Sequence, residues 1–385
     1  MKVLRMINGI EIEVEISESN AIYFDEKDAK EIGNSGYELD AIFNYLYNIN
    51  EQYRPLVMTL ELTKTCNYRC PFCFINTDEA RKRQSSQIKY DAIKEDLEWL
   101  CQNGLLYCII TGGEPLLHPD FIKIYSFLKQ HGVIVTVFTN ISLLNNDIIA
   151  LFEKYPPFKL ETTMYGFSDK KYTDITGQIY FKASDFKNKV LLLKERGINI
   201  ICKTPINNLT LPEFEIMRKW CMDNNIPYYF SEKVFETYEG ISMQQYDITL
   251  KEKQYILHER MLSEKSESLI LFGKKKSFTC GAGKYGFFIS HDYKLRPCMS
   301  FFDIPEACIH ITYGNISKSF EMLYKFISQY KGYTLSECNG CNAFSICKIC
   351  VIDEIKKKKG ETSGYKQKCA NNMEICKYLV ECTKE

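Results

Sequence analysis

Three cysteines near the start of the chain, Cys66, Cys70 and Cys73, stand in the string TCNYRCPFC with C-x3-C-x2-C spacing. Three thiolates on one tight loop can hold three irons of a [4Fe–4S] cube and leave the fourth open, whereas such clusters more often take four cysteines. The alternative is a zinc loop, but zinc sites usually pair C-x2-C units and close with four ligands. The next cysteine is Cys101, so no fourth ligand stands nearby. The spacing favours a cluster with one open iron.

A glycine-rich turn follows the cysteine loop. The apolar run 105–110 predicts a buried parallel strand, and it leads into Gly112, Gly113, Glu114 and Pro115. Two glycines let backbone approach a ligand closely, and Glu114 can accept a hydrogen bond from an ammonium group. The cysteine loop followed by GGEP closely resembles the radical S-adenosylmethionine (SAM) enzymes. The resemblance implies that SAM fills the open iron, that the GGEP turn binds its amino group, and that an electron from the cluster cleaves SAM to a 5′-deoxyadenosyl radical.

Strand and helix patterns alternate through the middle of the chain. Predicted strands cover 59–62, 105–110, 133–138, 158–164 and 198–203, and predicted helices cover 90–101, 121–131, 146–154 and 184–196. Such alternation predicts an α/β fold with a parallel sheet and right-handed crossovers. The family resemblance implies a partial (β/α)6 TIM-like barrel over 56–265.

Polar residues at the carboxyl ends of barrel strands face the ligand side. Thr162, Thr163 and Lys203 stand at such ends. We expect them near the SAM sugar or carboxylate. The alternative for each is an ordinary polar residue at the end of a strand.

A second group of cysteines follows residue 270. Their order resembles the SPASM domain, a C-terminal extension that holds auxiliary iron–sulfur clusters, and the match comprises Cys280, Cys298, Cys338, Cys341, Cys347, Cys350 and Cys369. The chain departs from that pattern twice, because Tyr293 replaces a glycine and the last pair is C-x2-C rather than C-x3-C. By spacing alone, C-x2-C-x5-C-x2-C also fits a zinc knuckle. The resemblance predicts a SPASM domain over 266–385.

The family's connectivity implies two auxiliary [4Fe–4S] clusters. One would be held by four cysteines, Cys338, Cys341, Cys347 and Cys369. The other would be held by Cys280, Cys298 and Cys350. The fourth ligand of that second cluster is either Cys308 or none, in which case the open iron is free for substrate or water.

Composition limits the cellular setting and the partners. The chain has 17 cysteines, no apolar signal region and no run long enough to span a membrane. This combination argues for metal use in a reducing cytoplasm rather than for disulfides. Open irons are oxygen-sensitive, so we expect an anaerobic setting. The 49 basic and 49 acidic residues cancel, whereas an RNA-modifying enzyme usually shows a basic footprint. We therefore expect neither nucleic acid nor membrane as a partner. Four cysteines within apolar patterns are expected to be buried structural thiols: Cys101, Cys108, Cys202 and Cys221.

The first 55 residues predict a separate small α+β unit. Isoleucine and valine alternate with glutamate over 10–16, which predicts a half-buried strand whose glutamates could blunt an exposed sheet edge. A helix is predicted over 37–47 with four residues facing inward, Leu39, Ile42, Phe43 and Leu46. Many peptide-modifying relatives carry an N-terminal winged-helix module that grips a leader peptide. This unit is short for a complete module, so it is either a reduced version or a cap on the barrel, which we favour.

These features predict a radical SAM/SPASM maturase that oxidatively modifies a peptide or protein at a side chain or backbone carbon. A thioether or carbon–carbon crosslink in a ribosomally made peptide fits, with flavodoxin or ferredoxin as electron donor. One alternative is an anaerobic sulfatase maturase that forms formylglycine. Such relatives place an acidic general base directly after the cysteine matching Cys298, where this chain has Met299 and its nearest acid is Asp303. Further alternatives are a small-molecule dehydrogenase on the same scaffold and a non-catalytic iron–sulfur sensor or binding protein.

Overall fold

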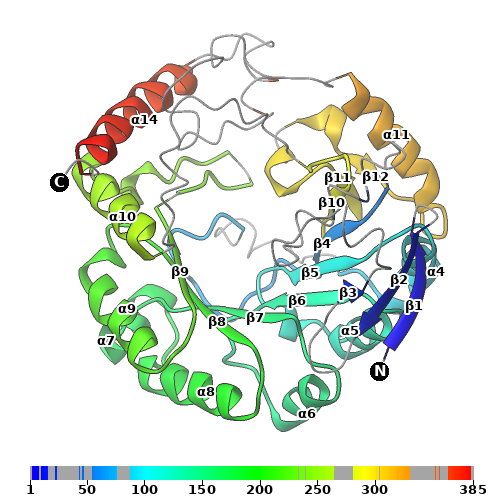
Figure 1. Ribbon diagram of the computed structural model, residues 1–385, viewed down its shortest axis with the longest axis horizontal. Helices are drawn as coiled ribbons and strands as arrows, with labels where there is room; N and C mark the ends of the chain where they lie inside the picture. Colours follow the sequence, from blue (N-terminus) through cyan, green and yellow to red (C-terminus); the bar gives the residue numbers. More distant parts are fainter. Residues whose placement is uncertain are drawn as a thin grey trace.

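The computed structural model describes residues 2–7, 10–15, 22–23, 43, 46, 54–75, 87–232, 234–238, 240–263, 281–302, 304–329, 352, 355 and 363–382. Within these residues a 9-stranded sheet has the order β12-β11-β10-β4-β5-β6-β7-β8-β9. A separate 3-stranded sheet has the order β1-β2-β3. Figure 1 shows the large sheet curving, with helices on its outer side.

Six parallel strands form the centre of the large sheet: β4 (Val57–Glu61), β5 (Tyr107–Thr111), β6 (Ile134–Phe138), β7 (Lys159–Thr163), β8 (Ile200–Pro205) and β9 (Tyr228–Ser231). The crossovers carry α4 (Tyr90–Gln102), α5 (Phe121–Gln130), α6 (Asn146–Lys154), α7 (Asp169–Thr176), α8 (Ala183–Glu195) and α9 (Phe214–Asp223). This arrangement confirms the predicted partial (β/α)6 barrel, and the predicted boundaries differ from the observed ones by a residue or two.

The barrel elements form where their apolar patterns predict. In α4, four residues on one face are buried against the sheet, namely Ile93, Leu97, Leu100 and Cys101. In β6, Ile134 to Val137 are all buried, as expected for a parallel strand covered on both faces. The four cysteines predicted to be structural, Cys101, Cys108, Cys202 and Cys221, are indeed buried.

A C-terminal hairpin extends the barrel sheet. Strand β10 (Gly286–Ile289) pairs in parallel with β4, and Ile289 lies opposite Leu60. Strands β11 (Lys294–Arg296) and β12 (Ile309–His310) follow in antiparallel order, and α11 (Ile316–Ser328) contacts both. The region expected to be cysteine-rich therefore begins as part of the same sheet as the cysteine loop.

Tyr293, which departs from the glycine of the SPASM pattern, takes the left-handed backbone conformation with φ 58°. Glycine takes this conformation freely, while other residues pay a steric cost. The Tyr293 hydroxyl donates to Asp96 Oδ2 on α4 at 2.6 Å, and its ring stacks on Tyr313 with centroids 4.6 Å apart. Asp96 also accepts from the N–H groups of Gly314 and Ile316, each at 2.9 Å, where α11 begins. The tyrosine thereby ties the C-terminal hairpin to the barrel.

Two long helices pack against each other. Helix α10 (Leu250–Ser263) packs against the C-terminal helix α14 (Ser363–Cys382), with Leu257 and Ile375 buried between them. Short 3-10 turns complete the described elements: η1 (Pro115–Leu117), η2 (Leu211–Glu213), η3 (Gln244–Tyr246), η5 (Met299–Phe301) and η6 (Pro305–Ala307). No helix in the described ranges is long and apolar enough to cross a membrane.

The N-terminal sheet comprises β1 (Lys2–Ile7), β2 (Ile10–Glu15) and β3 (Ile22–Tyr23), all antiparallel. Strand β2 is paired on both sides, so the expectation that its glutamates blunt a free edge is wrong. Of the predicted helix 37–47, only Phe43 and Leu46 lie within the described residues, and both are buried.

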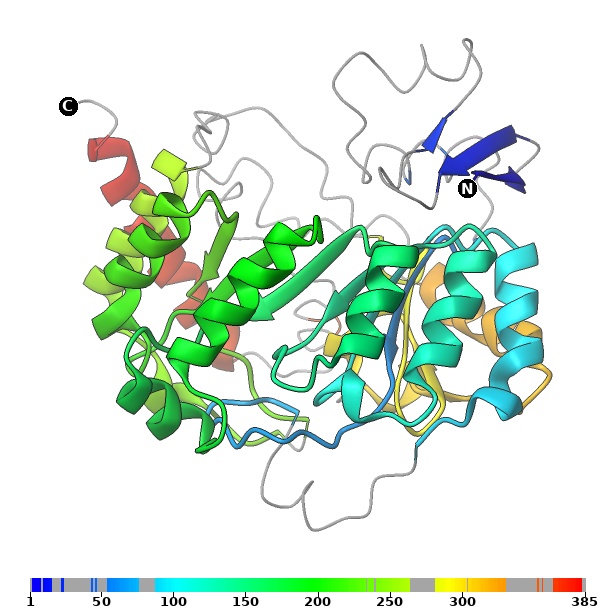
Figure 2. The same cartoon turned by 90° about the horizontal axis from the view of Figure 1, so that it is seen from below.

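The N-terminal sheet covers the amino ends of the first barrel strands. Its apolar side joins Leu56, Leu106 and Ile134, which stand where β4, β5 and β6 begin. The Arg5 guanidinium donates to the carbonyls of Leu105 and Cys101. Figure 2 shows this sheet on the opposite side of the barrel from the loop that follows β4.

Candidate active site

The cysteine loop leaves the carboxyl end of β4 as a tight turn. The N–H of Cys73 donates to the Cys70 carbonyl at 3.2 Å, and the N–H of Tyr68 donates to Cys66 Sγ at 3.4 Å. The N–H of Arg69 donates to the carbonyl of Thr176 at the end of α7 at 2.7 Å. Cys70 is buried, while Cys66 and Cys73 are half-buried. The structure therefore places all three predicted cysteines on one constrained loop.

The three thiols are close enough to influence one another. Burial raises the pKa of the Cys66 thiol to about 12, and it raises the pKa of Cys70 well above the ordinary value. The neighbouring Cys73 adds to both increases. Within the described parts of the chain, however, no three His, Cys, Asp or Glu side chains converge as a single metal ion requires.

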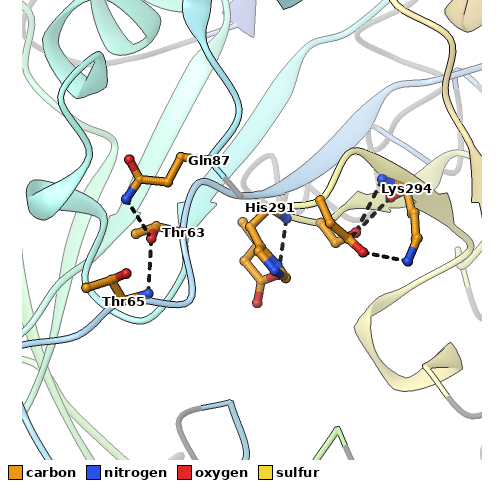
Figure 3. Close-up of polar contacts among 8 residues, drawn as sticks. Thr63, Thr65, Gln87, His291 and Lys294 are labelled. Atoms are coloured by element: carbon orange, nitrogen blue, oxygen red, sulfur yellow. Dashed lines mark hydrogen bonds and ion pairs between the residues drawn. The ribbon is translucent and has the colours of Figure 1, made fainter. Parts of the chain in front are cut away.

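The turn that enters the cysteine loop is fixed by Thr63. The Thr63 hydroxyl accepts from the N–H of Thr65 at 3.0 Å and from Gln87 Nε2 at 3.3 Å (Figure 3). The GGEP turn lies directly against this segment, since the N–H of Gly113 donates to the Thr63 carbonyl at 2.6 Å. The N–H of Glu114 donates to the Thr65 carbonyl at 2.8 Å. The two predicted motifs therefore meet backbone to backbone.

Close packing explains both glycines of the GGEP turn. A Cβ atom on Gly112 would stand 2.4 Å from the Thr63 carbonyl oxygen. A Cβ on Gly113 would stand 2.4 Å from the Thr65 oxygen and 2.5 Å from that of Lys64. Neither distance is compatible with a side chain, so this approach of two backbones requires glycine whether or not a ligand is bound.

The Glu114 carboxylate is fully buried and bound by protein donors. It accepts from the N–H of Leu116 at 3.0 Å, the hydroxyl of Thr139 at 2.7 Å and the N–H of Asn140 at 2.7 Å. Burial raises the pKa of Glu114 to about 7, against the lowering effect of these hydrogen bonds. In this structure Glu114 joins the GGEP turn to the carboxyl end of β6.

Two asparagines connect β6 to the cysteine loop. Asn140 Nδ2 donates to Asn67 Oδ1 at 2.8 Å and lies 3.9 Å from Cys66 Sγ. Asn67 Nδ2 in turn donates to the Ser142 hydroxyl at 2.8 Å. The sequence pattern gave no reason to select either residue beyond its place, because Asn140 comes shortly after a predicted strand and Asn67 is next to the first cysteine.

Thr163 and Lys203 lie opposite each other in the register of β7 and β8. The Lys203 ammonium forms an ion pair with Glu161 and stands over the Phe138 ring, 4.4 Å from its centroid. Because strand side chains alternate, Thr162 points to the other face of β7, where it is buried. The structure therefore brings Thr163 and Lys203 together, separates them from Thr162, and gives Lys203 an anionic partner.

Most of the predicted SPASM cysteines lie outside the described residues. Cys298, Cys308 and Cys369 are half-buried. The other predicted ligands lie outside the described residues: Cys280, Cys338, Cys341, Cys347 and Cys350. The assignment of auxiliary-cluster ligands stays a prediction.

Comparison with known proteins adds family evidence. Residues 60–220 match the radical SAM superfamily model. The subtilosin biosynthesis protein AlbA of Bacillus subtilis is 24% identical over 263 residues, which cover 66% of this chain and 56% of AlbA. The PqqA peptide cyclase of Rhodopseudomonas palustris is 28% identical over 96 residues, or 25% of each chain. The chain thus aligns with little more than half of AlbA and a quarter of the cyclase.

Solved structures share the fold over nearly the whole chain. Streptococcus suis SuiB bound to the precursor peptide SuiA gives a TM-score of 0.65 at 14% identity, covering 93% of this chain and 96% of SuiB. Native anSMEcpe with bound AdoMet gives a TM-score of 0.60 at 17% identity, covering 86% of this chain and 99% of anSMEcpe. The cysteine loop and the GGEP turn meet at the carboxyl end of a partial barrel, and both lie within the residues that match the radical SAM superfamily.

Proposed function

We propose that the protein is a radical SAM/SPASM maturase that oxidatively modifies a peptide, forming a thioether or carbon–carbon crosslink in a ribosomally synthesised precursor. The observation that carries this proposal is the pairing of β10 with β4. It places the cysteine loop next to the hairpin that leads to Cys298, the first described cysteine of the SPASM pattern. The names of two relatives, a bacteriocin subtilosin biosynthesis protein and the PqqA peptide cyclase, support the same substrate class, as does the precursor peptide bound to SuiB.

The chain's own residues have defined tasks in this proposal. Cys66, Cys70 and Cys73 would hold the cluster that supplies the electron for SAM cleavage. Asn67 and Asn140 orient the loop, and the GGEP turn fixes its entry. Gly112, Gly113, Glu114, Pro115, Thr163 and Lys203 are the proposed SAM-binding residues. A flavodoxin or ferredoxin would deliver the electron in an anaerobic cytoplasm.

The SPASM cysteines would hold two auxiliary [4Fe–4S] clusters, whose chemistry is to accept the electron that the oxidation leaves behind. Replacing Cys308 with Ala distinguishes the two versions of the auxiliary site that Cys280, Cys298 and Cys350 would form. Loss of iron from that site would mean that Cys308 is a ligand, and unchanged iron would mean that the site is open to substrate.

A sulfatase-maturase function is the second candidate, because the fold also matches anSMEcpe with a bound Cys-containing peptide at a TM-score of 0.59. Met299 occupies the position where those relatives carry the acidic base, and it begins η5. Asp303 lies outside the described residues. The missing acid weighs against formylglycine formation.

Metal analysis of protein prepared without oxygen tests the proposal. About twelve irons per chain with little zinc would correspond to three cubes. About four irons with bound zinc would contradict an auxiliary-cluster oxidation. Cys341→Ala should lower the iron content by about four atoms per chain. Cys101→Ala, which alters a buried thiol outside the motifs, should leave the iron content unchanged. If the wild-type protein yields no 5′-deoxyadenosine with SAM and dithionite, the proposed radical function is wrong.

A further inference from the structure

A buried acid and a histidine meet at the edge of the sheet where the cysteine loop begins. Glu61, the last residue of β4, accepts at Oε2 from the N–H of His291 at 3.2 Å, and His291 Nδ1 lies 2.7 Å from the same oxygen. His291 stands in the turn that follows β10. Because β10 runs parallel to β4, both residues lie at the carboxyl ends of their strands. Figure 3 shows His291 with the turn of Thr63 and Thr65 on one side and Lys294 on the other.

Burial of the Glu61 carboxylate is energetically unfavourable. Its side chain is 1% exposed, and Oε1 has no hydrogen-bond partner among the described residues. A buried acceptor left without a partner costs about 1–3 kcal/mol, and more when charged. Packing alone would favour an apolar residue at this position. The buried carboxylate therefore indicates a task beyond stability.

Further polar groups without partners gather at the same place. The Tyr238 hydroxyl and Arg296 Nε are also buried without a hydrogen bond within the described residues. Burial, and then the nearby Glu61 carboxylate, raise the pKa of the Tyr238 hydroxyl well above its ordinary value. The N–H of Tyr238 donates to the Phe74 carbonyl at 3.0 Å, directly beyond Cys73. These buried polar groups therefore gather around Glu61, beside the cysteine loop.

The orientation of the imidazole suits proton removal. A carboxylate at Nδ1 keeps the proton on that nitrogen and leaves Nε2 as an acceptor. Across the described residues no hydrogen bond occupies Nε2, and the His291 side chain is 11% exposed against 1% for Glu61. The imidazole is therefore the accessible member of the pair.

We propose that His291, oriented by Glu61, is the general base that deprotonates the attacking side chain of the substrate peptide. The heteroatom–hydrogen bond breaks, its electron pair stays on the heteroatom, and the proton passes to Nε2, giving an imidazolium paired with Glu61. A cysteine thiol, with an ordinary pKa of about 8.5, gives up its proton to a base more readily than a tyrosine hydroxyl at about 10. This inference rests on the proposed function and narrows it to thioether formation.

Nitrogen-15 NMR of histidine-labelled protein tests the orientation without any substrate. The chain has only 5 histidines, and His291→Gln assigns the relevant signals. We expect a protonated Nδ1 and an unprotonated Nε2 in His291, and loss of that preference in Glu61→Gln. A proton fixed on Nε2 in the wild-type protein would overturn the assignment.

A display library of short cysteine-containing peptides, read by a mass loss of two hydrogens, tests the reaction. On any peptide that the wild-type enzyme converts, His291→Gln should lower conversion about 100-fold or more. His310→Gln, which changes an exposed histidine on β12, should lower it little. Equal conversion by the two variants would refute the base assignment. A library that wild type leaves unconverted would count against the proposed function, while the NMR result still decides the orientation of His291.

Discussion

Gly113→Ala should detach the GGEP turn from the cysteine loop. The new Cβ would stand 2.4 Å and 2.5 Å from the carbonyl oxygens of Thr65 and Lys64, which are backbone atoms and yield little. Forcing an extra carbon into a packed site costs about 1–3 kcal/mol. Displacing the turn also weakens the hydrogen bonds from Gly113 to Thr63 and from Glu114 to Thr65, each contributing about 0.5–1.5 kcal/mol. We expect a loss of about 2–6 kcal/mol in unfolding free energy.

Gly197→Ala is the matched control. Gly197 has φ +73°, and a Cβ there meets nothing within 4 Å, so the substitution costs only the left-handed backbone, about 1–2 kcal/mol. Denaturant unfolding and iron content per chain, measured on anaerobically reconstituted protein, compare the two variants. Gly113→Ala should lose both stability and loop-bound iron, while Gly197→Ala should keep its iron. If the two variants unfold together and bind equal iron, the close approach of the backbones does not hold the loop.

Three further predictions concern other contacts. Cys70→Ala should remove a cluster ligand and abolish 5′-deoxyadenosine formation, and retained SAM cleavage would show that the loop is not the radical site. Tyr293→Phe removes the donor to Asp96 and should lower the unfolding free energy by about 1.5–3 kcal/mol, and an unchanged value would mean that the Asp96 bond does not hold the hairpin. Burial raises the pKa of Glu114 from 4.5 to about 7. At about 1.4 kcal/mol per pKa unit, the unfolding free energy of the wild-type protein should therefore fall by about 3 kcal/mol as the pH rises from 4.5 to 7. Glu114→Gln should remove that slope, measured as denaturant midpoints at pH 5 and pH 8, and a slope that persists would place the titration elsewhere.

The barrel could be predicted because short strand-like segments alternate along the chain with helices that carry one apolar stripe. These are local patterns that each element shows by itself. The cysteine loop and GGEP turn were equally local, and the structure brings them into contact. The pairing of β10 with β4 could not be foreseen, since the residues GFFI say nothing about which distant strand lies beside them.

Roles that depend on neighbours were the least predictable. The sequence marked Glu114 as a ligand-binding carboxylate, whereas the structure surrounds it with protein donors from η1 and from the two residues that follow β6. Glu61 stood within a predicted strand with no sign that a histidine 230 positions later would reach it. The glutamates of β2 alternate as they would on an edge strand, because alternation reports one buried face and not the number of paired neighbours.

The position of β4 between β10 and β5 determines how the chain can be divided. If the chain were cut after the barrel, the backbone N–H and C=O groups of β4 that face β10 would lose their partners, and the strand that begins the catalytic loop would become a bare edge. Such edges recruit other chains and aggregate. A barrel expressed without its C-terminal region should therefore be insoluble rather than merely inactive, and the two regions should unfold in one transition.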